Sequence, residues 1–352
     1  MSKSLGNGVD PMDVIDQYGA DTLRFFLTTN SAPGMDLRYI PEKLEASWNF
    51  INKIWNSARF VLMNIDEDLE YKDLKFDHLN LCDKWILNRL NNVIEEVDAN
   101  MDKFEFVNVG SELYKFIWDD FCSWYIELTK VHLNSDNEVE KQASAHTLVY
   151  VLNAIVRMLH PFMPFVTEEI YQAIPHLEES ICISKYPTVN PDFNDENINK
   201  QFTYLMDIVK GVREIRANYT IKNAIEVEYS IETKDEDLQE LLDQCVPYLK
   251  KLCNATCVGY NQETSKDVAT AMIQGGNTLI VELGAYVDKE AEKQKLQVEL
   301  QKLEGEIKRC TNMLSNEKFV SKAPQAKVDS ERQKLEDYTS KYNAVKEKLA
   351  AM

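Results

Sequence analysis

The strongest pattern in the chain is an apolar stripe at alternating three- and four-residue spacing between residues 41 and 65. This spacing is that of one face of an α-helix, so it predicts a single long amphipathic helix that packs on a core. The predicted core-facing residues are Leu44, Trp48, Ile51, Trp55, Ala58, Leu62 and Ile65. Asn52, Asn56 and Arg59 fall on a different face, which is either plain solvated surface or the contact for a polar partner.

The same logic predicts helices over 10–29, 81–101, 107–133 and 138–173, and hence a helical bundle. Gly19 is expected to break the first helix, and Pro161 and Pro164 to kink or split the last one. The 107–133 helix carries six aromatic residues within twelve positions, too many for one core stripe. Two interpretations stay open for this helix: packing on both of its sides, or a platform on which nucleic-acid bases stack.

A second, smaller unit follows a proline-rich stretch without periodicity at 174–197, where a domain boundary is predicted. The pattern there predicts a small α+β module with two helices, one strand and a hairpin. The expected elements are helix 198–218, strand 225–231, helix 238–253 and a hairpin of 267–273 with 278–283 around Gly275, Gly276 and Asn277.

The end of the chain predicts a coiled-coil hairpin. Two heptad-like runs alternate steps of four and three residues: Leu296, Leu300, Leu303, Ile307, Cys310 and Leu314, then Leu335, Tyr338, Tyr342, Val345 and Leu349. Pro324 ends the short connection between the two runs. The second helix is therefore expected to return antiparallel to the first, and the fold class is mainly α.

The distribution of charge along the chain is more informative than the net charge. The whole chain carries 39 Lys and Arg against 58 Asp and Glu, a net charge of −19 that argues against nucleic acid. Residues 285–352, however, hold 14 basic and 12 acidic residues, a net charge of +2, against −21 for the first 284. The terminal hairpin is therefore electrostatically distinct from the remainder.

Other sequence features exclude several classes. No window has the length and apolarity of a membrane span, and no secretory leader is visible, so a cytoplasmic protein is expected. The seven cysteines are interpreted as reduced thiols. Cys253 and Cys257 lack the partners of a zinc motif, and the five histidines form no constellation, so no metal site is predicted.

The first eight residues, MSKSLGNG, place one ammonium group and two hydroxyl groups in a glycine-flanked loop ahead of a helix. Such a loop can fold over a triphosphate, and Lys3 can neutralise the charge that develops on its oxygens. Four residues alone are a weak signal, and on their own they favour a frayed terminus. The context adds long ordered blocks: SAPGMDLRY at 31–39, NFINKIWNSARFVLMN at 49–64, FIWDDFCSWYIELTK at 116–130, LHPFMPFVTEEIYQ at 159–172 and NEKFVSKAP at 316–324.

With these blocks the chain resembles the valine–tRNA ligase family of class I aminoacyl-tRNA synthetases, whose signature loop is KMSKS. The resemblance covers nearly the whole chain but starts at the second letter of that motif, so a C-terminal fragment is expected. It implies that the intact enzyme activates valine with ATP and Mg²⁺ and transfers it to valine tRNA. The HIGH motif, amino-acid pocket and editing domain of the family have no counterpart here, so this chain alone is expected to bind no cofactor and to be inactive.

The resemblance also assigns parts and residues. Residues 1–40 are expected to end the catalytic domain, 41–190 to form the anticodon-binding bundle, 197–284 the α+β module, and 285–352 a tRNA-binding arm. Lys3 resembles the motif lysine that contacts ATP phosphates, with Met1, Ser2 and Ser4 in the same loop. Candidate tRNA contacts are Lys43, Lys53, Asn56, Arg59 and Phe60 on the first bundle helix, and Lys308, Arg309, Lys318, Lys322, Lys327 and Arg332 on the arm.

For each of these candidates an ordinary helix surface, a core flank or a solvated coiled-coil face explains the same residues. Two other functions stay open: a stand-alone tRNA-binding module without catalysis, and a structural protein that dimerises through its coiled coil. Because Pro324 separates two matched heptad runs, the sequence favours pairing within one chain and a monomer.

Overall fold

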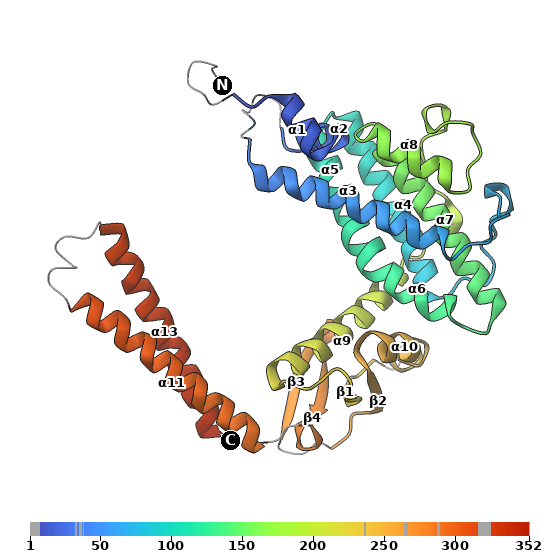
Figure 1. The fold of residues 1–352 in the computed structure, drawn as a ribbon. Helices are drawn as coiled ribbons and strands as arrows, with labels where there is room; N and C mark the ends of the chain where they lie inside the picture. The colour runs from blue at the N-terminus through green and yellow to red at the C-terminus, as the bar shows by residue number, and fades with distance from the viewer. Residues whose placement is uncertain are drawn as a thin grey trace. The chain divides into compact units, whose positions relative to one another are not determined.

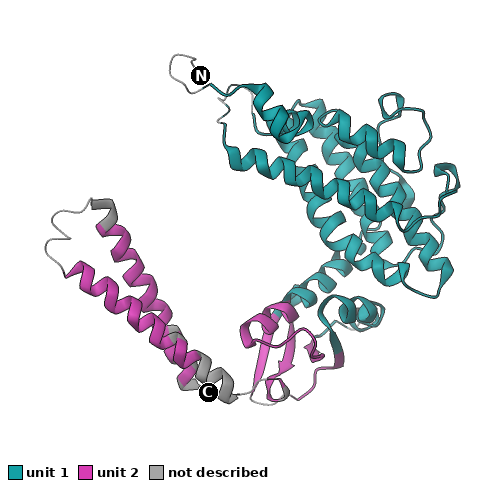
Figure 2. Ribbon diagram, in the orientation of Figure 1, with its two compact units in different colours: residues 1–210, 233–256, 272–277 teal, residues 211–232, 257–271, 278–352 magenta. Residues whose placement is uncertain are grey.

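The structure is a computed structural model of a mainly helical protein (Figure 1). It describes residues 8–31, 34, 37, 39–235, 237–263, 267–286, 289–315 and 325–351. The chain divides into two compact units (Figure 2): one comprises 1–210, 233–256 and 272–277, the other 211–232, 257–271 and 278–352. No helix in the described ranges combines the length and apolarity that crossing a bilayer requires.

The predicted first helix is two helices, α1 (Pro11–Tyr18) and α2 (Ala20–Thr29). The Asp10 side chain caps α1 by accepting a hydrogen bond from the Met12 amide at 2.9 Å, and Pro11 occupies the first turn. Gly19 between the helices has φ of +87°, a backbone conformation that L side chains rarely adopt. The predicted break at Gly19 is therefore confirmed.

The bundle follows in the order that the sequence predicts. Its elements are α3 (Pro41–Leu62), α4 (Leu81–Asp102), α5 (Phe106–Lys115), η3 (Phe116–Tyr125), α6 (Ile126–Leu133), α7 (Glu138–Leu159) and α8 (Pro164–Ala173). The predicted 138–173 helix is split at 160–163, as its prolines require. Three single 3₁₀ turns, η2 (Tyr71–Asp73), η4 (Ile181–Ile183) and η5 (Pro191–Phe193), lie in the connections.

The middle of the predicted 107–133 helix is a π-helix, η3, which runs for ten residues. Ser123 Oγ donates to the Trp118 carbonyl five residues earlier at 2.7 Å, a spacing that suits the wider turn. The aromatics of this segment are divided between interior and surface: Phe116, Phe121 and Tyr125 are buried, whereas Trp118 and Trp124 are half-buried. The crowding of aromatics is therefore accommodated mainly by packing.

A buried polar network joins three bundle elements, and a second set of polar contacts lies on α6. Asp83, in the first turn of α4, accepts hydrogen bonds from Tyr125 Oη at 2.7 Å and from Ser144 Oγ of α7 at 3.1 Å. Its side chain is fully buried, so the two donors replace water around the carboxyl group. On the neighbouring α6, His132 contacts Tyr248 Oη of α10 at 2.7 Å and Glu140 at 3.0 Å.

The small α+β part contains α9 (Ile198–Tyr219), β1 (Val227–Glu232), α10 (Asp237–Cys253), β2 (Ala255–Tyr260), β3 (Val268–Ile273) and β4 (Asn277–Glu282). Turns η6 (Gln274–Gly276) and η7 (Leu283–Ala285) complete it. The strand order is β2-β1-β4-β3, and β1 pairs antiparallel with β4 with Ile231 opposite Leu279. The predicted strand, helices and hairpin are present; β2 was not predicted.

The last two helices that the structure describes, α11 (Lys289–Leu314) and α13 (Gln325–Ala351), lie side by side (Figure 1). Arg309, near the end of α11, contacts Glu331, near the start of α13, at 3.5 Å, as antiparallel pairing requires. Cys310 and Val328 are buried between the helices, and the other predicted seam residues are half-buried. The fold class is thus confirmed, whereas the exact domain boundaries stay a prediction.

Burial of Asp83 generates a pH-dependent stability. Loss of hydration raises the pKa of Asp83 to about 6, from 3.8 in an exposed carboxyl, although Tyr125 and Ser144 partly oppose this shift. The folded state therefore binds the proton more tightly than the unfolded state. The resulting stabilisation is complete below about pH 4 and is lost as the pH rises through about 6.

We expect Asp83→Asn to remove this dependence, because an amide does not titrate. Its oxygen can accept from Tyr125 Oη, and its NH2 group can donate to Ser144 Oγ. Between about pH 7.5 and about pH 5, the free energy of unfolding of the wild type should rise by about 1 kcal/mol relative to the variant in urea titrations. The exposed Asp77 provides the matched control, since Asp77→Asn should leave the pH profile unchanged. If the free energy of unfolding varied with pH in the same way in the wild type and in Asp83→Asn, the raised pKa of Asp83 would be contradicted.

Candidate nucleic-acid interface

Helix α3 is rotated relative to the sequence prediction. Its buried residues are Leu44, Ser47, Phe50, Ile54, Ser57, Ala58 and Val61. The predicted core residues Trp48 and Trp55 are instead 41% and 42% exposed, and Leu62 is also exposed. The predicted stripe is therefore wrong in phase, although Leu44 and Ala58 belong to both sets.

Hydrogen bonding allows serines to take part in the buried face of α3. Ser57 Oγ donates to the Lys53 carbonyl at 2.8 Å and lies 3.0 Å from the Cys122 thiol of η3. Ser47 Oγ similarly donates to the Lys43 carbonyl one turn earlier. Because these hydroxyls are satisfied, small residues can occupy the packing face beside Phe50 and Ile54, and the tryptophans are left outside.

The outward side of α3 then presents a row of large and polar side chains. Trp48, Asn52, Trp55 and Arg59 are spaced by four, three and four residues and so lie along one face. Asn56 is exposed next to this row, as is Arg59 within it. We call these five residues the α3 outer face. It combines two exposed indole rings with amide and guanidinium donors, the groups that stack on and hydrogen-bond to unpaired bases.

The remaining candidates on α3 have protein partners. The Lys53 ammonium lies 4.3 Å from the centroid of the Trp118 ring and 3.4 Å from Ser123 Oγ. Trp118 in turn stacks on Tyr114 at a centroid distance of 5.5 Å. Lys53 therefore holds η3 against α3 through a cation–π contact, an interaction of about 0.5–1 kcal/mol at a partly exposed site.

Phe60 is half-buried, and the Lys130 ammonium lies 5.5 Å from its ring centroid. Lys130 also forms an ion pair with Glu127 at 2.6 Å. Lys43 is exposed in the first turn of α3. The structure thus brings Asn56 and Arg59 together with two tryptophans that the sequence analysis assigned to the core, and leaves Lys53 and Phe60 at the edge.

On the arm, Arg309 is engaged by two carboxylates: Glu306 at 2.8 Å and Glu331 at 3.5 Å. Arg332 lies 3.8 Å from Asp329, while the Lys308 side chain is exposed. These ion pairs link or stabilise the arm helices, so Arg309 and Arg332 are partly neutralised. The loop residues Met1, Ser2, Lys3 and Ser4, together with Lys318 and Lys322, lie outside the described residues, as does the Lys327 side chain.

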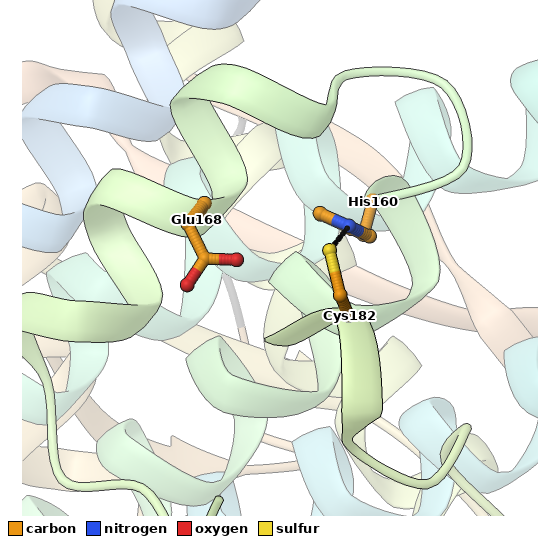
Figure 3. Close-up of side chains that lie close together, drawn as sticks. All are labelled: His160, Glu168 and Cys182. Carbon is orange, nitrogen blue, oxygen red and sulfur yellow. Dashed lines mark hydrogen bonds between the residues drawn. The ribbon is translucent and has the colours of Figure 1, made fainter. Parts of the chain in front are cut away.

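A second cluster, which sequence spacing did not reveal, lies on another part of the bundle (Figure 3). His160, Glu168 and Cys182 come from the end of α7, from α8 and from η4. Their ligand atoms all lie within 4.8 Å of one another. Twenty-two residues separate His160 from Cys182, and no short motif joins them.

The orientation of α3 predicts the accessibility of its tryptophans. Trp48→Phe and Trp55→Phe should each reduce the fraction of tryptophan fluorescence that acrylamide quenches. Trp85→Phe is the matched control, because Trp85 is 3% exposed and stacks on Phe202 at 3.7 Å. Removing Trp85 should leave the quenched component intact. If the quenched fraction of the fluorescence depended on Trp85 and not on Trp48 or Trp55, the two α3 tryptophans would be buried, as the sequence pattern predicted.

Family models match three parts of the chain. They are described as tRNA synthetases class I (I, L, M and V) over 1–39, anticodon-binding domain of tRNA ligase over 83–231, and valyl tRNA synthetase tRNA binding arm over 288–352. Helix α3 lies between the first two matched ranges. A LeuRS–tRNA–LeuAMS complex from Agrobacterium radiobacter superposes on 55% of this chain and 23% of its own, with TM-score 0.43 and 20% identity, too distant to define the fold.

Relatives named valine–tRNA ligase match the chain from end to end, α3 included. The Enterococcus faecalis protein is 46% identical over 354 residues, and the Listeria innocua protein 45% identical over 355, each covering 100% of this chain. A Staphylococcus aureus relative is 46% identical over 99% of it. The chain spans 40% of the length of each of these relatives. The chain therefore belongs to the valine–tRNA ligase family and corresponds to the C-terminal portion of those enzymes.

Proposed function

We propose that this chain is the tRNA-recognition part of a valine–tRNA ligase and that the α3 outer face contacts the bases of valine tRNA. The observation that carries this proposal is the exposure of Trp48 and Trp55 in one row with Asn52 and Arg59. Burial of these rings within the protein would stabilise the bundle, yet Phe50 and Ile54 occupy the packing face instead. Single-stranded nucleic acids are bound by aromatic side chains on which bases stack, next to positively charged groups.

The chemistry of this face suits unpaired bases. An indole ring stacks on any base, at about 1–3 kcal/mol per base, whereas Asn amides hydrogen-bond to base edges and so discriminate between them. Arg59 adds a cation for phosphate or for stacking. This combination supports recognition of a single-stranded loop, such as an anticodon, better than recognition of a duplex.

The arm adds affinity without sequence preference. Its net charge of +2 contrasts with the −21 of the first 284 residues, so phosphates are repelled least there. Lys308, Lys318, Lys322 and Lys327 are the proposed phosphate contacts; Arg309 and Arg332, which have carboxylate partners, are weaker candidates. Pairing of α11 with α13 within the chain supports a monomer rather than a coiled-coil dimer.

For the intact ligase we propose ATP-dependent activation of valine with Mg²⁺ and its transfer to tRNA, in the cytoplasm. In that enzyme Lys3, with Met1, Ser2 and Ser4, would neutralise charge on the ATP phosphates as pyrophosphate leaves. The class I model matches only residues 1–39 of this chain. The chain alone is therefore proposed to bind tRNA without activating valine.

Substitutions on α3 test the proposed interface. Trp55→Ala should weaken binding of valine tRNA by about 5- to 150-fold through loss of base stacking. Arg59→Gln should lower the slope of log Kd against log salt by about 1 if the guanidinium contacts a phosphate. Both side chains are on the surface, so circular dichroism spectra should match the wild type.

Phe165, which is 68% exposed on α8, provides the matched control, because Phe165→Ala removes an exposed aromatic ring from a different face. Its affinity for valine tRNA should equal that of the wild type. If Trp55→Ala and Arg59→Gln also bind like the wild type, the α3 outer face lies outside the tRNA interface.

A further inference from the structure

The His160, Glu168 and Cys182 cluster holds three types of metal-ligating atom in one place (Figure 3). His160 directly follows α7, Glu168 lies in the second turn of α8, and Cys182 is the middle residue of η4. The Cys182 Sγ atom is 3.3 Å from His160 Nε2. Neither the tRNA interface nor the arm uses these residues.

Thr167 fixes which nitrogen of the neutral histidine ring carries the proton. Its hydroxyl donates to the Met163 carbonyl at 2.7 Å, so the same hydroxyl oxygen accepts from His160 Nδ1–H at 2.8 Å. The proton is then on Nδ1, and Nε2 presents its lone pair towards Cys182. Metal-ligating histidines characteristically donate their other N–H group to an oxygen in this way.

Glu168 is held in position by neighbouring donors. Gln172 Nε2 donates to one carboxylate oxygen at 2.8 Å, and Ser180 Oγ donates to the other at 3.0 Å. Burial alone would raise the pKa of Glu168, but these hydrogen bonds, together with the His160 ring, lower it overall. These two hydrogen bonds therefore orient the carboxylate.

The surroundings also favour a cation. Burial, the largest effect, lowers the pKa of His160. The charged groups that act on this ring, Glu168 and Asp21, are both carboxylates. Cys182 is exposed, so an ion can reach the cluster from solvent.

We propose that His160 Nε2, a Glu168 carboxylate oxygen and the Cys182 thiolate bind one zinc ion, with water as the fourth ligand. Imidazole, thiolate and carboxylate together suit zinc, which accepts N, S and O ligands in tetrahedral geometry. Bonds of about 2.0–2.3 Å place tetrahedral ligand atoms roughly 3.3–3.7 Å apart. The observed His160–Cys182 distance already meets this requirement. The Glu168 oxygen lies within 4.8 Å of the other two atoms, and a side-chain rotation that gives up one of its two hydrogen bonds would bring it to the ion.

Binding converts the Cys182 thiol into a thiolate, so one proton leaves for solvent as the Zn–S bond forms, and no electrons are exchanged. The ion would join η4 to α8 and to the end of α7. Its role would be structural: it would fasten the 174–183 connection, which otherwise depends on contacts such as Gln172 with the Glu179 carbonyl, to the bundle.

The test uses the full chain, reduced and stripped of metal. Isothermal titration with Zn²⁺ should give one ion per chain, and Co²⁺ should produce the near-ultraviolet charge-transfer absorption of a thiolate–cobalt bond. Cys182→Ser should abolish that absorption and weaken zinc binding at least about tenfold. Thr167→Val should weaken it about 10- to 100-fold, because the orienting hydroxyl is lost while side-chain volume is kept.

Cys257, a half-buried thiol on β2, provides the matched control, and Cys257→Ser should leave both signals unchanged. Zinc should also raise the thermal unfolding midpoint of the wild type but not of Cys182→Ser. Absence of stoichiometric binding, or zinc affinity that is the same in wild type and Cys182→Ser, would overturn the proposal. The His160–Cys182 contact would then be a hydrogen bond only.

Discussion

The packing of Phe50, Ile54 and Val61 against the bundle determines which way every other side chain of α3 points. Side-chain directions along a helix are fixed relative to one another, so burying these three residues turns Trp48, Trp55 and Arg59 away from the core. Ser47 and Ser57 make this phase possible, because each satisfies its hydroxyl on its own helix and allows close approach. The proposed tRNA interface is thus a consequence of core packing. If α3 were rotated by about 90° about its own axis, the two tryptophans would face the core and the interface would be lost.

A π-helix, a cation–π contact and a buried carboxyl group hold α3 in this orientation within the bundle. The π-helix η3 places some of its closely spaced aromatic residues in the interior and others at the surface. The ring of Trp118 in η3 makes a cation–π contact with the Lys53 ammonium of α3. Behind it, Tyr125 donates to the buried Asp83, which Ser144 also contacts. Because a buried carboxyl tolerates few arrangements of donors, this network specifies how α4, η3 and α7 meet. The bundle is therefore specified by polar as well as apolar contacts.

Much of the fold was predictable, because its signals are local. The Asp10 cap, Gly19, and the prolines at 161 and 164 act within a few residues, and the arm seam repeats along its own helices. The phase of α3 was not predictable from spacing, since Trp48 and Trp55 match the periodicity as well as Phe50 and Ile54 do. Strand β2 and the His160–Cys182 contact depend on tertiary structure. Of the candidate tRNA residues, spacing correctly put Asn56 and Arg59 on the surface but could not reveal the partners of Lys53 and Arg309.

We propose that this chain recognises valine tRNA through its bundle and that the arm adds electrostatic affinity. The most direct measurement is equilibrium binding of the chain to valine tRNA, to the same tRNA with a swapped anticodon, and to an unrelated tRNA, over a series of salt concentrations. We expect preferential binding of valine tRNA at every salt concentration and loss of that preference on swapping the anticodon. Binding of equal strength to all three, falling in parallel with salt, would contradict it.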